Sequence, residues 1–536
     1  MQIFKLKRIE GFIIVLLFVN TFIAPKSEEL STTSKKYTIK EKTISQLLND
    51  LDQGSVTSED LVKIYLKRIE DFDKKGPRIS SVLSINPNAI KDAQEKDKQR
   101  KEGRALGLMH GIPVLLKDNI ESKDLIPTTA GSLALANNLT GRDAPIVAKL
   151  RKAGAIILGK SNLSEWANFR STKSTSGWSG VGGLTRNPYS LEYSACGSSS
   201  GSAAAVAANF ISVAVGTETD GSIICPSSIN GIVGLKPTVG LLSRRLIVPI
   251  SHTQDTPGPM GRTVSDVAIM LKVMAGSDKM DSKTKLSDNK IKDYPNLLNA
   301  NSLNGVRLGV LRPKGQFGEM TATSYSSALD IMRKAGAILV EINEPLNRRK
   351  IWTNEMIVLL HEFKFNLNNY LSGTPDKVKI KSLEELITFN KKNKALEMPY
   401  FGQELFLQSQ ETAGIKTESY LSALKENIKL AGEKGIDRLL NNYNIDALIS
   451  PSAGPAFKID LKNGDSFSGS QTTLAAVAGY PHLTVPMGHV SGLPLGLSFI
   501  GEAWSEAKLL SLGYAFEQKA KKRITPDVGS IKDVSP

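Results

Sequence analysis

Residues 195–208 read ACGSSSGSAAAVAA, and this stretch decides how the chain is interpreted. Serine and glycine fill its centre, and small apolar residues follow at once. A flexible linker would continue in polar, low-complexity sequence. A phosphate-binding loop would need a lysine and a hydroxyl residue in the frame G-x-x-x-x-G-K-S/T, which this stretch lacks. The stretch therefore predicts a serine-bearing loop that runs directly into a small, closely packed helix.

The next segments of the chain should bring a second serine loop close to the first. We expect a helix over about residues 202–209, roughly 12 Å long, and a strand over residues 211–215, roughly 17 Å long. If the helix and the strand run antiparallel, the chain returns close to its starting level. There it meets residues 216–228, GTETDGSIICPSS, with Ser222 near their centre. Two serine-bearing loops are thus expected at one edge of the domain.

Short apolar runs alternate with helix-like stretches along the chain. They read GIPVLL (111–116), AIILG (155–159), FISVAVG (210–216), VRLGVL (306–311), AILVEI (337–342), DALISP (446–451) and HLTVPM (482–487). This alternation predicts an α/β fold, with a large mixed β-sheet core covered by helices on both faces. Residues 57–70 predict an amphipathic helix with Thr57 as its cap and Asp60 at the third helical position. Residues 350–440 look mostly helical, and no linker divides the single domain predicted over residues 39–536.

The N-terminal residues indicate export. Three basic residues within the first eight precede an apolar run, GFIIVLLFVNTFIA (11–24), as in a secretory signal. The run is short for a membrane-spanning helix. We expect residues 1–25 to be a signal peptide or an uncleaved N-terminal anchor, and residues 26–38 to be a polar spacer. The protein would then be periplasmic or extracellular, with any membrane contact made by this segment; a cytosolic chain with an apolar leader is the alternative.

Charge and cysteine content limit the classes of partner. The formal net charge is +15, but the basic residues are dispersed and have few aromatic neighbours, so solvated faces explain them better than a nucleic-acid surface. Cys196 and Cys225 are the only cysteines, which excludes a disulfide framework, and no histidines beside them suggest zinc. A bridge between the two is one alternative. We predict two packed thiols instead, and the oligomeric state stays open.

A third motif lies upstream of both serine loops. In GIPVLLKDNI (111–120) an apolar strand ends at Lys117. The motifs G-I-P-x-x-x-K-D, G-S-S-x-G and G-T-x-x-x-G-S, in this order, resemble those of the amidase signature family of serine amidases. The resemblance extends over nearly the whole chain after residue 40. The forms CGSSSGS and GTETDGSI look more like the bacterial peptide amidase branch than the glutaminyl-tRNA amidotransferase subunits. The commoner family form of the first loop, G-G-S-S-G-G-S, has glycine where this chain has Cys196 and Ser200.

The resemblance implies a Ser-Ser-Lys catalytic triad. Ser222 would attack the amide carbonyl and form an acyl-enzyme, Ser198 would pass on its proton, and a neutral Lys117 would accept it. Burial at the end of an apolar strand favours the neutral form of a lysine. No metal ion or organic cofactor is needed for this chemistry.

The resemblance also implies how the site is supported. Backbone N–H groups of the second loop would hold the oxyanion, which is typically worth roughly 3 to 4 kcal/mol per key donor; they belong to Thr219, Asp220, Gly221 and Ser222. The peptide bond between Gly197 and Ser198 would be cis. Ser199 would orient the site by hydrogen bonds, although solvation of the loop explains it equally well.

Several alternatives remain open. A Ser-His-Asp triad would need His110 or His252 in the pocket, but the sequence lacks a G-x-S-x-G elbow. The leading substrates are small amides or C-terminally amidated peptides, with a general aliphatic or aryl-amide amidase as the runner-up. An amidotransferase A-type subunit is a different class, against which the N-terminal leader argues. An inactive binding protein conflicts with the intact Lys117, Ser198 and Ser222.

Overall fold

The structure is a computed structural model that describes residues 37–105, 107–312, 317–344 and 346–530. The chain divides into two compact units, Met1–Thr38 and Ile39–Pro536, and only the second is described below. The predicted signal or anchor, residues 1–25, lies outside the described residues, and so does all of the predicted spacer except its last two residues.

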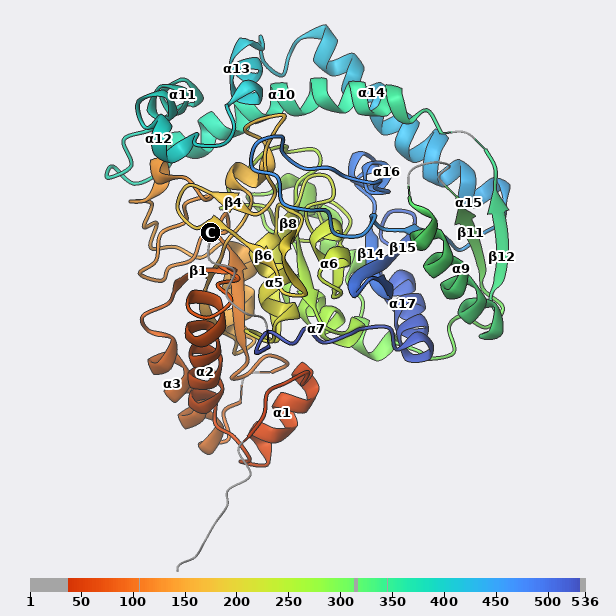
Figure 1. Ribbon diagram of the computed structural model, residues 1–536, viewed down its shortest axis with the longest axis horizontal. Coiled ribbons are helices and arrows are strands. Elements are labelled where there is room, and N and C mark those ends of the chain that lie inside the picture. The colour runs from red at the N-terminus through yellow and green to blue at the C-terminus, as the bar shows by residue number, and fades with distance from the viewer. Residues whose placement is uncertain (1–36, 106, 313–316, 345, 531–536) are drawn as a thin grey trace, which may run out of the picture. The chain divides into compact units, whose positions relative to one another are not determined.

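An eleven-stranded mixed sheet forms the core of the second unit (Figure 1). Its strands, in spatial order, are β1 (Val82–Ile85), β3 (Ile156–Ser161), β2 (Pro113–Lys117), β8 (Val213–Glu218), β10 (Thr256–Gly261), β9 (Val233–Lys236), β14 (His482–Val490), β15 (Leu493–Ile500), β13 (Ala447–Pro451), β11 (Arg307–Leu311) and β12 (Ile338–Ile342). The neighbours β3, β2 and β8 run parallel, whereas β10 runs antiparallel to β8. Two small ribbons lie outside this sheet, β4 (Trp178–Ser179) with β5 (Gly183–Leu184), and β6 (Arg186–Asn187) with β7 (Ser190–Ser194).

Helices cover both faces of this sheet. They are α1 (Ile44–Asp52), α2 (Ser58–Arg68), α3 (Ala89–Lys101), α4 (Pro145–Lys152), α5 (Ser200–Ala207), α6 (Ile224–Ile229), α7 (Val264–Met274), α8 (Ser287–Lys290), α9 (Glu319–Lys334), α10 (Arg348–Ser372), α11 (Leu383–Lys392), α12 (Lys394–Glu397), α13 (Glu404–Glu411), α14 (Glu418–Ala431), α15 (Arg438–Asn442), α16 (Thr473–Ala478) and α17 (Glu506–Ala520). Side chains of β14 alternate between the faces. Leu483 and Val485 meet Gly513 of α17, whereas Thr484 and Ser228 of α6 both lie against Gly496. The predicted α/β fold, with helices on both faces of a mixed sheet, is confirmed.

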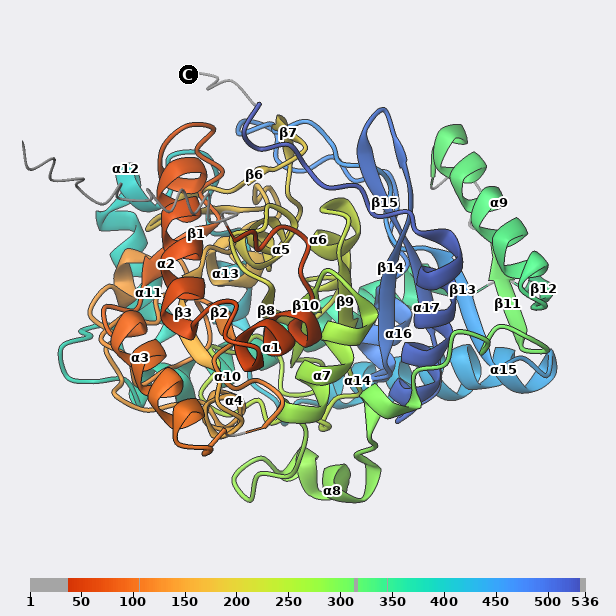
Figure 2. The same ribbon diagram turned by 90° about the horizontal axis from the view of Figure 1, so that it is seen from below.

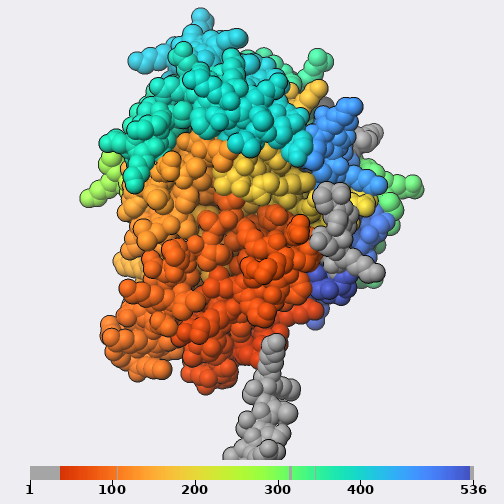
Figure 3. Space-filling view, turned by 60° about the vertical axis from the view of Figure 1, so that its left-hand side comes forward, coloured from red at the N-terminus to blue at the C-terminus, as the bar shows by residue number. Residues whose placement is uncertain are grey.

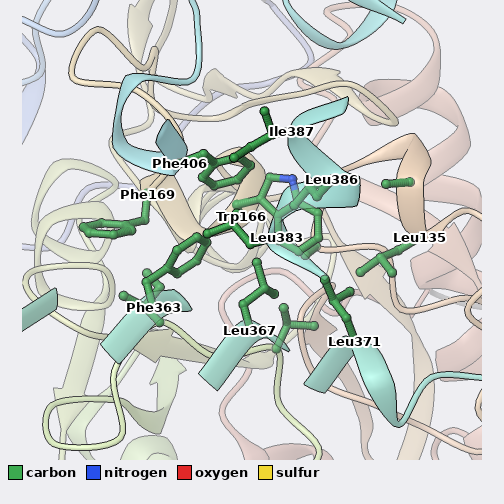
Figure 4. Packing of buried hydrophobic residues seen from close by; sticks show 14 of the residues in the cluster. Leu135, Trp166, Phe169, Phe363, Leu367, Leu371, Leu383, Leu386, Ile387 and Phe406 are labelled. Carbon is green, nitrogen blue, oxygen red and sulfur yellow. The ribbon is translucent and has the colours of Figure 1, made fainter. Parts of the chain in front are cut away.

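A layer of helices from α10 to α14 lies on one side of the domain, opposite α7 and α17 (Figures 1 and 2). In Figure 3 this layer, coloured teal, rests on the orange part of the chain. A cluster of buried side chains joins the two (Figure 4). Phe363, Leu367 and Leu371 of α10 pack there with Leu135 and Trp166. The layer is therefore anchored to the core by apolar contacts of its own.

The pattern of apolar runs predicted seven of the eleven strands. The four that it missed are β1, β9, β10 and β15. Strand β10 reads TPGPMG, and two prolines in six residues argue against a central strand. The helix predicted over residues 57–70 is α2, and Thr57 Oγ1 accepts the N–H of Asp60 at 3.0 Å while the Asp60 carboxylate accepts the N–H of Thr57 at 3.2 Å. None of the helices in the described part of the chain combines the length and apolar character needed to cross a membrane.

Candidate active site

The lysine and both serine loops meet at one edge of the sheet. Strands β2 and β8 are parallel neighbours, so Lys117 at the end of β2 lies beside Thr217 near the end of β8. Helix α5 then accounts for the return of the chain, because it starts at Ser200, directly after the first serine loop, and leads back to the start of β8. The juxtaposition predicted from segment lengths is therefore present.

The Lys117 side chain is fully buried and ends among three oxygen atoms. Its Nζ lies 2.7 Å from Ser198 Oγ, 2.9 Å from Thr217 Oγ1 and 3.1 Å from Thr217 O. Burial lowers the pKa of Lys117 to about 7, although the negative charges of Glu218 and Asp255 act in the opposite direction. A neutral amine has two hydrogens and one lone pair. Two Thr217 oxygens can accept the hydrogens, which leaves the lone pair for the Ser198 hydroxyl.

Ser198 is held from its backbone. The peptide bond between Gly197 and Ser198 is cis, as the resemblance implied. Ser164 N–H donates to Ser198 O at 3.0 Å. A Cβ atom on Gly197 would lie 2.1 Å from Ser164 Oγ, so any other residue there would displace the Ser164 hydroxyl. These contacts help to fix the position from which the Ser198 hydroxyl reaches Lys117.

Ser222 lies on the second loop, next to the first. The N–H of Ser199 donates to Ser222 O at 3.1 Å, which joins the two loops directly. Ser222 is 8% exposed, and its hydroxyl makes no hydrogen bond to any residue that the structure describes. Of the two serines in the predicted triad, it is the one whose hydroxyl is not bound to another described residue.

The Ser199 side chain ties the first loop to β8. It is fully buried, so it does not solvate the loop. Its hydroxyl donates to Thr217 O at 3.1 Å and accepts the N–H of Thr217 at 3.2 Å. Ser199 therefore positions the same threonine that binds Lys117.

The loop from Thr219 to Ser222 is shaped by its side chains, while its backbone N–H groups stay available. Thr219 Oγ1 donates to Asp255 at 2.6 Å, and Thr473 Oγ1 donates to Asp220 at 2.7 Å. Gly221 has φ +80°, a conformation that favours glycine. None of the four N–H groups of residues 219–222 donates to an acceptor in the described part of the chain. This arrangement suits the binding of a developing oxyanion.

Comparison with known proteins identifies the family. The sequence pattern of the family described as Amidase matches residues 60–510. The chain belongs to the amidase family. An Arabidopsis thaliana protein named probable amidase is 38% identical over 509 residues, covering 92% of this chain and 93% of its own. The protein is thus an amide-hydrolysing enzyme, as predicted.

Two solved structures indicate where this amidase lies within the family. The native peptide amidase from Stenotrophomonas maltophilia superimposes with a TM-score of 0.87 at 45% identity, covering 92% of this chain and 99% of that one. A glutamyl-tRNA(Gln) amidotransferase subunit from Thermotoga maritima gives a TM-score of 0.69 at 26% identity, covering 91% and 98%. The amidase is therefore closer to the peptide amidase than to the amidotransferase protein, as the loop motifs predicted.

The prediction of two packed thiols is wrong, because Cys196 and Cys225 form a disulfide in this amidase. Their Cα atoms are 6.0 Å apart, at a sequence separation of 29. The two cysteines flank the serine loops, and the bridge is possible only because these loops meet at one edge of the sheet.

The two histidines considered as alternative bases have other partners. His110 precedes β2 and Lys117 ends it, so the two residues lie at opposite ends of that strand. The His110 ring contacts Lys96 O at 2.9 Å. His252 lies 3.4 Å from Glu362 and 3.2 Å from Asn366. Because the hydroxyl of Ser222 has no partner in the described residues, neither histidine is placed as its base in the amidase.

A cavity of about 400 Å³ lies beside Thr217, the residue that binds Lys117. Asn119, Thr217 and Thr219 line the part next to Lys117, and Asp255 borders it as well. Its apolar wall is formed by residues 247–250, and its polar side includes His252, Asn366 and Asn369. Ser222 is not among the residues that line the cavity.

Sequence reasoning missed three residues that organise the site. Thr217 binds Lys117, Asn119 Nδ2 donates to Thr217 Oγ1 at 2.9 Å, and Asp255 binds Thr219. Thr217 and Asn119 belong to motifs already recognised, GTETDGS and KDN, so their polarity within otherwise apolar strand ends was the available signal. Within the described residues, no group of three or more histidine, cysteine, aspartate or glutamate side chains could hold a metal ion.

Proposed function

We propose that this amidase hydrolyses C-terminally amidated peptides through an acyl-enzyme formed on Ser222. The observation that carries the catalytic part is the contact of 2.7 Å between the fully buried Lys117 amine and the Ser198 hydroxyl. A serine hydroxyl needs a base beside it to become a nucleophile. A lysine that burial leaves about half neutral at pH 7, with Ser198 as the proposed relay to Ser222, supplies such a base without a histidine.

In the proposed reaction each of these residues has one role. Ser222 Oγ attacks the carbonyl carbon of the amide while its proton moves to Ser198 Oγ, and the Ser198 proton moves to Lys117 Nζ. The N–H groups of residues 219–222 stabilise the negative oxygen of the tetrahedral intermediate. The proton then returns through Ser198 to the leaving nitrogen, so ammonia departs and an ester on Ser222 remains. A water molecule attacks this ester by the same proton path and releases the free acid.

Two observations support peptide amides as the substrates. The amidase is 45% identical to the Stenotrophomonas maltophilia peptide amidase, and the alignment covers 92% of the chain. The cavity beside Thr219 offers about 400 Å³, with an apolar wall and a polar side, which is enough room for amino-acid side chains. A general amidase for aryl or fatty amides would need less polar lining.

A substrate panel tests this function. Purified enzyme is given amidated dipeptides, free amino-acid amides, a fatty amide and an aryl amide, and ammonia release is measured for each. We expect the highest kcat/KM for the amidated dipeptides and no release by Ser222→Ala, whose fold is checked by circular dichroism. Preference for the fatty or aryl amide would contradict the proposed substrate class, and activity of Ser222→Ala would contradict the proposed nucleophile.

We also propose that the enzyme is exported. The basic, short apolar N-terminus supports this, and the Cys196–Cys225 disulfide adds independent support, because disulfides persist mainly in oxidising compartments. Expression in a bacterial host followed by fractionation should place the protein outside the cytoplasm, with a new N-terminus near residues 22–30 if the signal is cleaved. Soluble cytosolic protein that retains Met1 would contradict export.

A further inference from the structure

The disulfide joins the two loops that carry the proposed catalytic serines. Cys196 lies two residues before Ser198, and Cys225 lies three residues after Ser222. The bridge holds their Cα atoms 6.0 Å apart. A covalent bond this near to both serines limits how far the loops can separate.

The backbone at Cys196 shows that its side chain occupies an unusual place. Cys196 has φ +54°, in the left-handed region that side chains seldom adopt and glycine adopts freely. The commoner family form of this loop has glycine at the same position. The chain therefore has a cysteine at a position whose backbone conformation suits glycine. The bond to Cys225 explains why a cysteine is present there.

Hydrogen bonds and apolar packing also tie the loops together. Ser199 N–H donates to Ser222 O at 3.1 Å, and Asn230 Nδ2 donates to Ala195 O at 2.9 Å. The Ser199 hydroxyl donates to Thr217 O at 3.1 Å and accepts the N–H of Thr217 at 3.2 Å. Around the bridge the contacts are apolar, with the buried residues Ile229, Ala453, Ala456 and Leu493. If the bridge were absent, these non-covalent contacts alone would carry the spacing between Ser198 and Ser222.

We propose that the Cys196–Cys225 disulfide is a positioning element for catalysis, which keeps Ser198 within proton-transfer reach of Ser222, and that full turnover requires it. This inference rests on the proposed roles of the two serines. A dithiol opens the bridge by supplying two electrons and two protons: the enzyme S–S bond breaks, two thiols form, and the dithiol is oxidised to its own disulfide. Cys196 is fully buried and Cys225 is 5% exposed, so reduction of the folded enzyme is slow.

The double variant Cys196→Ala/Cys225→Ala tests the proposal, with Leu367→Ala as the control. Leu367 is fully buried in the separate apolar cluster under α10 (Figure 4), so its truncation lowers stability without touching the serine loops. Both variants are assayed well below their melting temperatures. We expect kcat of the double variant to fall about 100-fold, with a much smaller change in KM, because small displacements of reacting groups cost rates of this order. The control should keep kcat close to that of the wild type.

Equal kcat values in the double variant and in the control would overturn the positioning role. A second readout separates this from a failure of the proposed function. A fluorophosphonate probe reports the reactivity of Ser222 without any amide substrate, and we expect the double variant to be labelled about 100-fold more slowly than the wild type. Equal labelling rates for the wild type and the double variant would refute the positioning role of the disulfide. A wild type that hydrolyses no peptide amide would contradict only the proposed substrate.

Reduction of the wild-type enzyme covers the case in which the double variant does not fold. The folded protein is incubated with dithiothreitol, new thiols are counted by alkylation and mass spectrometry, and activity is measured in parallel. Activity should fall in proportion to the fraction of opened bridges while circular dichroism stays unchanged. Full activity of a sample in which thiol counting finds every bridge open would overturn the proposal.

Discussion

The dependence of turnover on pH tests the role of Lys117. Burial lowers the pKa of this amine to about 7. The neutral fraction of Lys117 is then about one half at pH 7 and about one tenth at pH 6, and it falls about tenfold for each further pH unit below 6. An ordinary lysine would be neutral in only about 1 molecule in 2,500 at pH 7. We therefore expect kcat/KM, which reports the free enzyme, to rise about tenfold between pH 5 and pH 6 and to level off above pH 8.

The assay is ammonia release from an amidated dipeptide at pH 5 to 9, with three enzymes compared. Lys117→Arg should be inactive throughout, because a guanidinium keeps its proton at every working pH. Asp255 needs its own control, since burial raises the pKa of its carboxyl to about 6, inside the same pH range. Asp255→Asn should keep the rise in rate but move it to lower pH, because the negative charge that raises the pKa of Lys117 is gone.

Two results would refute the reasoning. Near-normal turnover by Lys117→Arg would exclude a neutral lysine as the base. Disappearance of the rise in Asp255→Asn, with a flat profile from pH 5 to 9, would assign the titration to the aspartate. A histidine base would instead give a rise that is lost on replacing His252 and kept in Lys117→Arg.

Three further predictions concern stability and packing. The pKa of Lys117 is lower in the folded chain than in the unfolded chain, so the unfolded chain binds more protons between about pH 7 and pH 10. The unfolding free energy of the wild type, measured by urea denaturation, should therefore rise over this pH range relative to that of Lys117→Met. The disulfide closes a loop with a sequence separation of 29, for which chain entropy gives about 3.6 kcal/mol, so Cys196→Ala/Cys225→Ala should lose roughly that much in the same assay. Gly197→Ala places a Cβ atom 2.1 Å from a hydroxyl oxygen and should greatly reduce turnover, whereas Gly318→Ala, with nothing within 4 Å, should leave it unchanged in the ammonia assay.

The sequence predicted those parts of the fold that depend on local pattern. Strands β2, β3 and β8 are continuous apolar runs and are recognisable as such. Strand β10 is not, because its two prolines argue against a strand; they lie outside Met260–Gly261, the part of β10 that pairs with β9. The partners of a strand are set by contacts between distant segments, which a local pattern does not encode.

The candidate site shows the same division. Lys117, Ser198 and Ser222 lie in motifs whose order and register mark them. Thr217 lies in a recognised motif, but its contact with Lys117 arises only from the parallel pairing of β2 and β8, and Asp255 acquires its role from a loop contact with Thr219. The disulfide was misjudged for the same reason, because whether two thiols bond depends on how close the folded loops lie.

The helical layer from α10 to α14 is held to the core by its own apolar cluster and gives Asn366 and Asn369 to the cavity wall, whereas Lys117, Ser198 and Ser222 all come from the sheet and its adjoining loops. The proposed proton path thus lies outside this layer. On the proposed function, mutations of Asn366 and Asn369 can change which acyl group is accepted while the proton path stays intact, so directed evolution of new amide specificities should begin with these two residues.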